Sequence, residues 1–289
     1  MVVTGIDSRA VTILQAIILG IVQGVTEFAP ISSSGHLILF PWAFGWDIVR
    51  DPALNKTFDV ALHMGTLLGA LIYFRADLWR YVKAFVASCL ARAIRTPDER
   101  LAWAIVIGTI PGVIVGAAFQ SVIEDTLGQP IVIAAMLAVF GVILYVVDRA
   151  APSDRGIASI GPRTGLFAGL AQALALQPGV SRSGVTMTAN RAISLDREAA
   201  ARFSFLLALP IIAGAGALKA VDVAHTGLAG YGGQFLAGFL AAAVSGFLVI
   251  WFLLGYLRTH DFLVFMIYRL VVAALVIALI VSGARPATT

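Results

Sequence analysis

The chain has little charge and almost no cysteine. Charged residues make up 12% of its 289 residues, and the formal net charge is +4. So small a charge points away from a surface that binds nucleic acid, and we expect no nucleic-acid partner. The single cysteine, Cys89, excludes any disulfide within the chain. The N-terminal residues lack the basic start and cleavage site of a secretory signal peptide, so we expect the first hydrophobic stretch to remain in the mature protein.

Hydrophobic residues are what the chain has in excess. They make up 60% of the sequence, and the mean hydropathy is +0.93. A soluble core of this size could not cover so many apolar side chains. The sequence therefore predicts an all-α integral membrane protein, surrounded by membrane lipids, with one membrane domain over residues 1–289. Six segments approach the roughly 20 apolar residues of a spanning helix: 57–74, 101–119, 131–147, 200–219, 233–257 and 262–282.

The chain also repeats itself, without a gap, at an offset of 149 residues. GIVQGVTEFAPISSSGH at residues 20–36 corresponds to GLAQALALQPGVSRSGV at residues 169–185. In both copies an apolar stretch reaches a proline, and a Ser/Gly cluster and a second apolar piece follow. Backbone broken at membrane depth is tolerated only inside protein or beside a water-filled cavity. Each copy therefore predicts a re-entrant helix-loop-helix pair, within a repeat 1 of about residues 10–148 and a repeat 2 of about 160–283.

The number of spans predicts how the two halves are oriented. Each half contains one re-entrant pair and three spans. Because an odd number of spans leaves the chain on the opposite side of the membrane, the second half enters upside down, which makes an inverted-topology repeat. Arginine and lysine concentrate in segments 75–100 and 149–163, which should be cytoplasmic, whereas segments 120–130 and 220–231 contain neither. Both termini are then expected outside, and the two Ser/Gly tips are expected to meet inside the membrane.

The first tip gathers polar side chains at the end of one helix and the start of the next: Gln23, Glu27, Ser32, Ser33, Ser34 and His36. Gln23 and Glu27 are four residues apart and share a helix face. A carboxylate in an apolar run needs a partner, unless Glu27 only reaches interfacial water from a helix end. The serines follow a proline, where hydroxyls and free N–H groups cap a new helix and can bind an anion. His36 lies one turn after Ser33, so imidazole and hydroxyl can share a cavity, although either residue alone could be structural.

The second tip adds an arginine to a similar set: Ser181, Arg182, Ser183 and Thr186. The planar guanidinium of Arg182 suits phosphate oxygens. The alternative is that Arg182 is a counter-ion to Glu27 that only holds the fold together. Both tips together would offer a carboxylate, an imidazole, a guanidinium, several hydroxyls and two helix N-termini. This combination is typical of a site for a polyanion with a leaving group.

With these motifs the chain resembles the BacA/UppP family of bacterial undecaprenyl-diphosphate phosphatases. Residues 23–36 fit the family pattern (E/Q)xxxE followed by PxSS(S/T)GH, and residues 178–186 fit PGxSRSGxT. REAAARFSFLLALP at 197–210 and FMIYR at 265–269 extend the likeness. The resemblance implies hydrolysis of undecaprenyl diphosphate to the monophosphate, with a divalent cation, Mg²⁺ or Ca²⁺. It also implies an inner-membrane protein with a periplasm-facing site that recycles the lipid carrier of peptidoglycan synthesis and confers bacitracin resistance.

We expect each polar residue of the two tips to have a role in that reaction. Ser181, Arg182, Ser183 and Thr186 should hold the diphosphate, together with Ser32 and Ser34. Glu27, helped by Gln23, should bind the cation, although many relatives carry glutamate in place of this glutamine. His36 should act as general base or acid. Ser33 is either a nucleophile activated by His36 or a phosphate-binding hydroxyl, with water attacking directly.

Two other classes of function compete with a phosphatase. Inverted repeats with broken helices also build transporters, so the chain could instead move an isoprenoid lipid phosphate between leaflets. An intramembrane protease using Ser33 and His36 is disfavoured by Arg182, which peptide cleavage does not need. His63 is expected at a helix interface, with contact to the pocket as the alternative. Arg269 either snorkels from the last span or is functional. The sequence leaves open whether the protein acts alone or as a homodimer.

Overall fold

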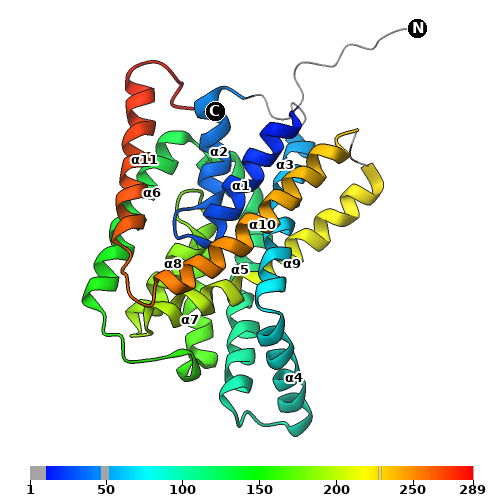
Figure 1. Ribbon diagram of the computed structural model, residues 1–289, viewed down its shortest axis with the longest axis vertical. Coiled ribbons are helices and arrows are strands. Elements are labelled where there is room, and N and C mark those ends of the chain that lie inside the picture. Colours follow the sequence, from blue (N-terminus) through cyan, green and yellow to red (C-terminus); the bar gives the residue numbers. More distant parts are fainter. Residues whose placement is uncertain (1–10, 47–51, 227, 229, 289) are drawn as a thin grey trace.

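The structure is a computed structural model that describes residues 11–46, 52–226, 228 and 230–288 (Figure 1). Apart from one isolated bridge between Arg155 and Leu195, the regular structure in these ranges is helical. The chain is therefore all-α, as the sequence predicts. In chain order the helices are α1 (Ile13–Phe28), α2 (Ser33–Phe44), α3 (Pro52–Tyr73), α4 (Arg75–Ala91), α5 (Pro97–Leu127), α6 (Pro130–Ala150), η1 (Ile157–Ser159), α7 (Pro162–Ala173), η2 (Leu174–Leu176), α8 (Arg182–Ala192), α9 (Arg197–Thr226), α10 (Gly232–Tyr256) and α11 (Leu263–Val281).

Five of the described helices are long and apolar enough to cross a membrane. They lie in α5, α6, α9, α10 and α11, and a sixth crossing is counted only if α3 and α4, which meet at 81°, form one span. The predicted span 57–74 falls on α3, whose first half carries polar residues such as Asp59 and His63. The predicted connections 120–130 and 220–231 are shorter than expected, because α5 continues to Leu127 and α9 to Thr226.

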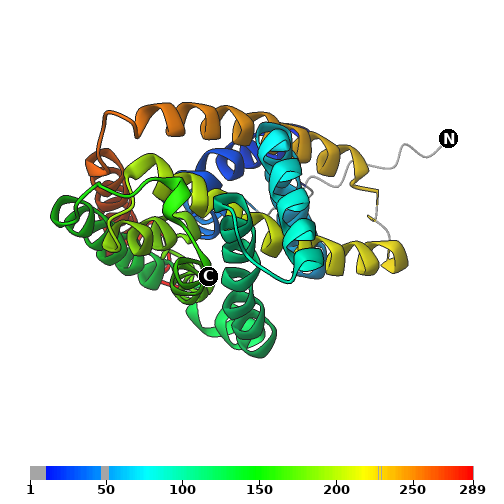
Figure 2. The same cartoon turned by 90° about the horizontal axis from the view of Figure 1, so that it is seen from below.

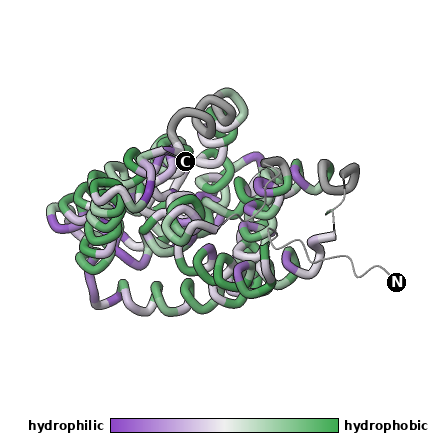
Figure 3. The backbone as a smooth tube through the Cα atoms, turned by 90° about the horizontal axis from the view of Figure 1, so that it is seen from above, coloured by the Kyte–Doolittle hydropathy of each residue, from purple (hydrophilic) through white to green (hydrophobic). Residues whose placement is uncertain are grey.

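The outer faces of the helices are apolar. Leu218, Trp251 and Leu275 are 77%, 64% and 59% exposed, and hydrophobic residues dominate the helices in Figure 3. Exposing a large apolar side chain to water costs about 1.5–3 kcal/mol relative to burying it, so a surface of this kind requires lipid around it. The protein is a multi-pass integral membrane protein.

The two broken pairs pack on helices from the opposite half of the chain. α1 lies along α10, and α7 lies along α5, while α3 packs between α10 and α9. α6 and α11 run side by side at one edge of the bundle (Figures 1 and 2). Each half therefore supplies the support on which the other half's first short helix rests.

Glycine makes these cross-half contacts close. A Cβ atom on Gly20 of α1 would lie 2.3 Å from the carbonyl oxygen of Gly238 in α10. At the position 149 residues later, a Cβ atom on Gly169 of α7 would lie 2.2 Å from the carbonyl oxygen of Gly108 in α5. Small residues let membrane helices approach to backbone contact. The repeated sequence thus uses the same packing device twice.

The arginine-rich segment 75–100 is largely helical. α4 forms a hairpin with the start of α5, at the foot of the molecule in Figure 1. The rings of Phe85 and Trp103 pack together with their centroids 5.0 Å apart, and Trp103 Nε1 donates to Ser88 Oγ at 2.9 Å. Thr96 caps α5, accepting from the N–H of Glu99 while the Glu99 carboxylate accepts from the N–H of Thr96. Side-chain contacts and a capping box therefore order this connection.

Candidate active site

Both tips have the same local structure. Pro30 and Pro178 follow the first helix of each pair, and the second helix begins directly after Ser32 or Ser181. Both serines have a φ of 77°, and each hydroxyl caps its helix by accepting from a glycine N–H three residues on, at 3.4 and 3.1 Å. Residues other than glycine adopt a positive φ at a cost in energy, so the surrounding structure must hold it. The duplicated sequence therefore produces a duplicated, strained turn.

The two tips are in direct contact. The N–H of Gly179 donates to Ser32 Oγ at 3.0 Å, and Ser183 Oγ donates to the carbonyl of Ala29 at 3.0 Å. Gly179 has a φ of 94°, and a Cβ atom there would lie 2.7 Å from the carbonyl oxygen of Ile133. Only glycine fits this position, because both the backbone conformation and the space exclude a side chain. The expected meeting of the tips is observed, and Ser32 is one of the links between them.

A single arginine from the last helix binds both tips. Arg269 is fully buried, and its guanidinium donates to five main-chain carbonyls at 2.8–3.3 Å. The five carbonyls belong to Pro30, Met136, Leu137, Gly179 and Val180. Arg269 therefore does not snorkel to an interface. It is a positioning residue, which the sequence left without a definite role because its partners are distant backbone atoms.

Glu27 is the centre of the polar cluster that the tips enclose. Its side chain is 2% exposed. Ser33 Oγ donates to Glu27 Oε2 at 2.6 Å, and Gln23 Nε2 donates to the same oxygen at 3.0 Å. Arg182 Nη1 lies 3.4 Å from Glu27 Oε1. The structure thus brings three other predicted residues, Gln23, Ser33 and Arg182, from both tips together around the Glu27 carboxylate.

His63 of α3 also reaches this carboxylate. Its Nε2 lies 3.5 Å from Glu27 Oε2, and its Nδ1 is 2.8 Å from the carbonyl of Asp59. The sequence places this histidine at a helix interface, and the structure places it in the site instead. Its position in the middle of a predicted span was the one feature of the sequence that pointed to a role for this histidine. Because it is distant in sequence from both motifs, the sequence gave no reason to place it near Glu27.

His36 points elsewhere than expected. Its Nδ1 lies 2.7 Å from the carbonyl of Ser32, and its Nε2 lies 2.9 Å from the hydroxyl of Tyr268, with the two rings stacked. A carbonyl only accepts, so Nδ1 carries the proton and Nε2 accepts from Tyr268. The proton of Ser33 is directed to Glu27 and not to the imidazole. In this arrangement Glu27, and not His36, is placed to accept the Ser33 proton, and the expected role of His36 as general base or acid stays a prediction.

Some of the remaining predicted residues are buried and bond to other parts of the protein, and others are partly exposed. Thr186 is fully buried, donates to the carbonyl of Arg182 at 2.7 Å, and contacts a serine of α9. In this arrangement Thr186 holds α8 against α9, and its role in binding substrate stays a prediction. Ser181 and Ser183 are buried, with their hydroxyls 3.2 Å apart. Ser33, Ser34 and Arg182 are partly exposed and line the accessible side.

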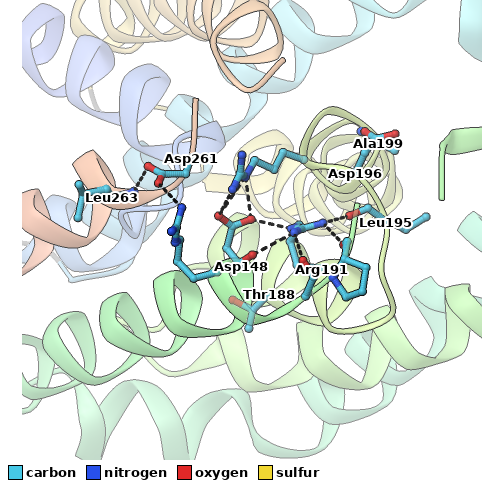
Figure 4. A network of polar contacts seen from close by, with 12 residues as sticks. Asp148, Thr188, Arg191, Leu195, Asp196, Ala199, Asp261 and Leu263 are labelled. Atoms are coloured by element: carbon cyan, nitrogen blue, oxygen red, sulfur yellow. Dashed lines mark hydrogen bonds and ion pairs between the residues drawn. The ribbon is translucent and has the colours of Figure 1, made fainter. Parts of the chain in front are cut away.

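A buried ion network fixes the far end of α8 (Figure 4). Arg191, 1% exposed, donates from Nε to Asp148 Oδ1 at 2.6 Å. Its other nitrogens donate to main-chain carbonyls in the last turn of α6 and in the α6–η1 and α8–α9 connections. Arg197 at the start of α9 pairs with the same carboxylate at 2.9 Å. Because α8 begins at Arg182, anchoring its other end helps to set the position of that guanidinium. The sequence assigned no chemistry to Arg191.

The chain matches a known family and several curated proteins. The model of a family described as bacitracin resistance protein BacA matches residues 16–275. The chain belongs to the BacA family. The match extends from α1 into α11, so both tips and Arg269 lie within it.

Curated relatives of this family cover nearly the whole chain. The undecaprenyl-diphosphatase of Moorella thermoacetica is 48% identical over 92% of this chain and 97% of its own length. Those of Desulforudis audaxviator and Thermomicrobium roseum are 44% and 43% identical, over 92% and 94% of this chain and 97% and 99% of their own lengths. The resemblance inferred from the motifs is confirmed.

Proposed function

We propose that the protein hydrolyses undecaprenyl diphosphate to undecaprenyl phosphate and inorganic phosphate. The observation that carries this proposal is the cluster of Ser33, Glu27 and Arg182 at the meeting of two helix N-termini inside an apolar bundle. Helix N-termini and a guanidinium attract a polyanion. The surrounding apolar helices let a long isoprenoid tail remain in the hydrocarbon layer. The names of the BacA relatives support the same substrate.

In the proposed mechanism Ser33 attacks the terminal phosphorus. The first-turn N–H groups of α2 and α8 and the guanidinium of Arg182 hold the phosphate oxygens and stabilise the charge of the transition state. Glu27 accepts the Ser33 proton across their 2.6 Å hydrogen bond as the new O–P bond forms. The bond from phosphorus to the bridging oxygen then breaks, and undecaprenyl phosphate leaves. Water hydrolyses the phosphoserine and releases phosphate. Direct attack by water, with Ser33 as a ligand of the phosphate, is the competing version.

The residues present fit a divalent cation. Gln23 Oε1 is a buried oxygen without a hydrogen-bond partner among the described residues, and Glu27 beside it is a carboxylate. Hard cations such as Mg²⁺ or Ca²⁺ take such oxygen ligands, and Glu27 and Gln23 would hold one. When bound, a cation at this position would neutralise charge on the phosphate oxygens.

We also propose how the protein lies in the membrane. The arginines of 75–100, which include those of α4, and those of 149–163 would face the cytoplasm of a bacterial inner membrane. The tips would then open toward the periplasm. Hydrolysis of undecaprenyl diphosphate on that side would recycle the lipid carrier for peptidoglycan synthesis and confer bacitracin resistance. Both termini would lie outside, although residues 1–10 and residue 289 are not among the described residues.

Release of phosphate by the purified protein tests the function. In detergent, with undecaprenyl diphosphate and Mg²⁺ or Ca²⁺, the protein should release phosphate. Glu27→Gln and Arg182→Ala should lower the rate at least about 100-fold, since each removes a group acting on the transition state. Ser282→Ala at the end of α11 is the control and should retain the rate. Absence of release, together with movement of lipid phosphate between leaflets of proteoliposomes, would contradict the proposal.

The role of Ser33 has its own test. With substrate labelled in the terminal phosphate, a covalent pathway places the label on Ser33 in rapidly quenched reactions. Ser33→Ala should then be inactive and unlabelled. A Ser33→Ala variant that retains the full rate would instead establish direct attack by water.

A further inference from the structure

Among the polar partners of Glu27 in the described part of the chain, His63 is the one that the mechanism above does not use. It lies in the middle of α3, and its side chain is 23% exposed. The two motifs of the tips do not include it. Its position therefore requires a separate explanation.

The ring of His63 is held so that one nitrogen faces the carboxylate. Nδ1 lies 2.8 Å from the carbonyl of Asp59. Because a carbonyl only accepts, Nδ1 carries a proton, and in the neutral ring Nε2 has a free lone pair. Histidines that bind metal ions characteristically donate their other N–H to a carbonyl or carboxylate, which orients the ring. His63 has that arrangement, with Nε2 directed at Glu27.

The distances around Glu27 Oε2 are those of ligands that share one ion. Its 3.5 Å separation from His63 Nε2 exceeds an ordinary hydrogen bond. Two ligand atoms about 2.1–2.2 Å from a common cation lie about 3.0–3.6 Å apart at angles near 90–110°. Gln23 Nε2 lies 3.0 Å from the same carboxylate oxygen, and a half-turn of the amide would bring the unpaired Oε1 to that position. After that rotation an amide oxygen and an imidazole nitrogen would lie 3.0 and 3.5 Å from one carboxylate oxygen.

This set leaves room for substrate. The described residues contain no group of three or more His, Cys, Asp or Glu side chains that could hold a metal ion by itself. A cation held by one carboxylate, one imidazole and one amide keeps open positions, which phosphate oxygens or water can fill. Ser33 Oγ, 2.6 Å from Glu27 Oε2, lies beside these positions.

We propose that His63 is a nitrogen ligand of the divalent cation, completing with Glu27 and Gln23 a site that prefers Mn²⁺ to Ca²⁺. The proposal deepens the proposed function, because it rests on a cation at the tips. Ca²⁺ takes oxygen ligands almost exclusively, whereas first-row transition metals also accept imidazole. The mixed ligand set, with a neutral glutamine in place of a second carboxylate, therefore changes the selectivity of the site as well as its affinity.

Pulsed electron paramagnetic resonance of bound Mn²⁺ tests the proposal without any lipid substrate. The full-length protein is labelled with ¹⁵N-histidine, purified in detergent and loaded with Mn²⁺. The spectrum should show ¹⁵N coupling. His63→Gln should abolish this coupling, weaken Mn²⁺ binding at least about tenfold, and lower the preference for Mn²⁺ over Ca²⁺ in competition. His260→Gln, which alters an exposed histidine outside the site, should keep both the coupling and the affinity.

Three results would overturn the proposal. They are failure of Mn²⁺ to bind, bound Mn²⁺ without ¹⁵N coupling in the unaltered protein, and coupling that persists in His63→Gln. The melting temperature of His63→Gln, measured alongside, should match that of the unaltered protein, and His63→Ser provides a second variant with the same expected loss of coupling. The metal-binding experiment measures no hydrolysis. If the protein released no phosphate from the lipid, the test of His63 would therefore still give an answer, and a negative result for His63 would leave the phosphatase proposal standing.

Discussion

Replacing Arg269 with lysine should loosen both tips at once. The guanidinium is fully buried and binds main-chain carbonyls of the first tip, the second tip and α6. Lysine keeps the positive charge but is a compact ammonium group on a flexible stem. The substitution therefore separates the geometry of the guanidinium from its charge.

The structure sets the size of the expected effect. The guanidinium donates to five carbonyls, one from Nε, one from Nη1 and three from Nη2, whereas an ammonium has only three N–H groups. At least two carbonyls then lose their donor in the interior. An unsatisfied buried acceptor costs about 1–3 kcal/mol, so the folded state should lose roughly 2–6 kcal/mol. At about 2–4 °C per kcal/mol, the melting temperature should fall by at least about 4 °C. A displacement of about 1 Å between the tips would lower the rate of hydrolysis about 100-fold.

Thermal unfolding in detergent and phosphate release measure the two effects. Arg182→Lys is the matched control, because this arginine is partly exposed and its recorded partner is the carboxylate of Glu27. We expect Arg182→Lys to lose activity with little change in melting temperature, and Arg269→Lys to lose both. If Arg269→Lys melts at the normal temperature and hydrolyses the lipid at the normal rate, Arg269 does not hold the tips together.

Three further substitutions test other contacts. Gly20→Ala should lower the melting temperature, because its Cβ atom would lie 2.3 Å from a carbonyl oxygen of α10. Gly116→Ala is the control, because a Cβ atom there has no neighbour within 4 Å. Equal melting temperatures for the two variants would contradict this packing. Asp148→Asn should destabilise the protein by about 3–5 kcal/mol in denaturant titrations, because it leaves two arginines without their shared counter-ion. Glu198→Gln, in an exposed pair, should leave the midpoint unchanged. Tyr268→Phe removes the hydroxyl bonded to the imidazole of α2 and should lower kcat about fivefold without changing KM; an unchanged kcat would show that this bond is dispensable.

Local sequence was enough to predict most of the helices and the polar residues of both tips. Apolar runs and prolines mark where α1 and the η2 turn after α7 end, and the serines after them cap new helices, because these are interactions between near neighbours. The gap-free repeat also predicted that Ser32 and Ser181 would have equivalent positions. Their φ of 77° in both tips reflects the same local sequence in the same kind of turn.

Long-range contacts were beyond such reasoning. His63 and Arg269 each look like an isolated polar residue in a span, and nothing in their neighbours indicates a partner 36 or 239 residues away. The structure shows no hydrogen bond between Ser33 and His36, for a related reason. Helical spacing shows that two side chains can share a face, but the rotamers depend on what packs there, and here Tyr268 takes the imidazole while Glu27 takes the hydroxyl.

By itself the sequence determined that the helices are surrounded by lipid, that the chain contains an internal repeat, and which polar side chains the two tips carry. Composition and short-range spacing are properties of the chain alone. Only the tertiary structure decided which of those groups meet. Hydrogen bonds and ion pairs act over a few ångströms, so their partners are known only once the tips are brought together by the glycine contacts of α1 and α7 and by the guanidinium of Arg269. The repeat predicted two similar turns, and folding made them one asymmetric site around Glu27.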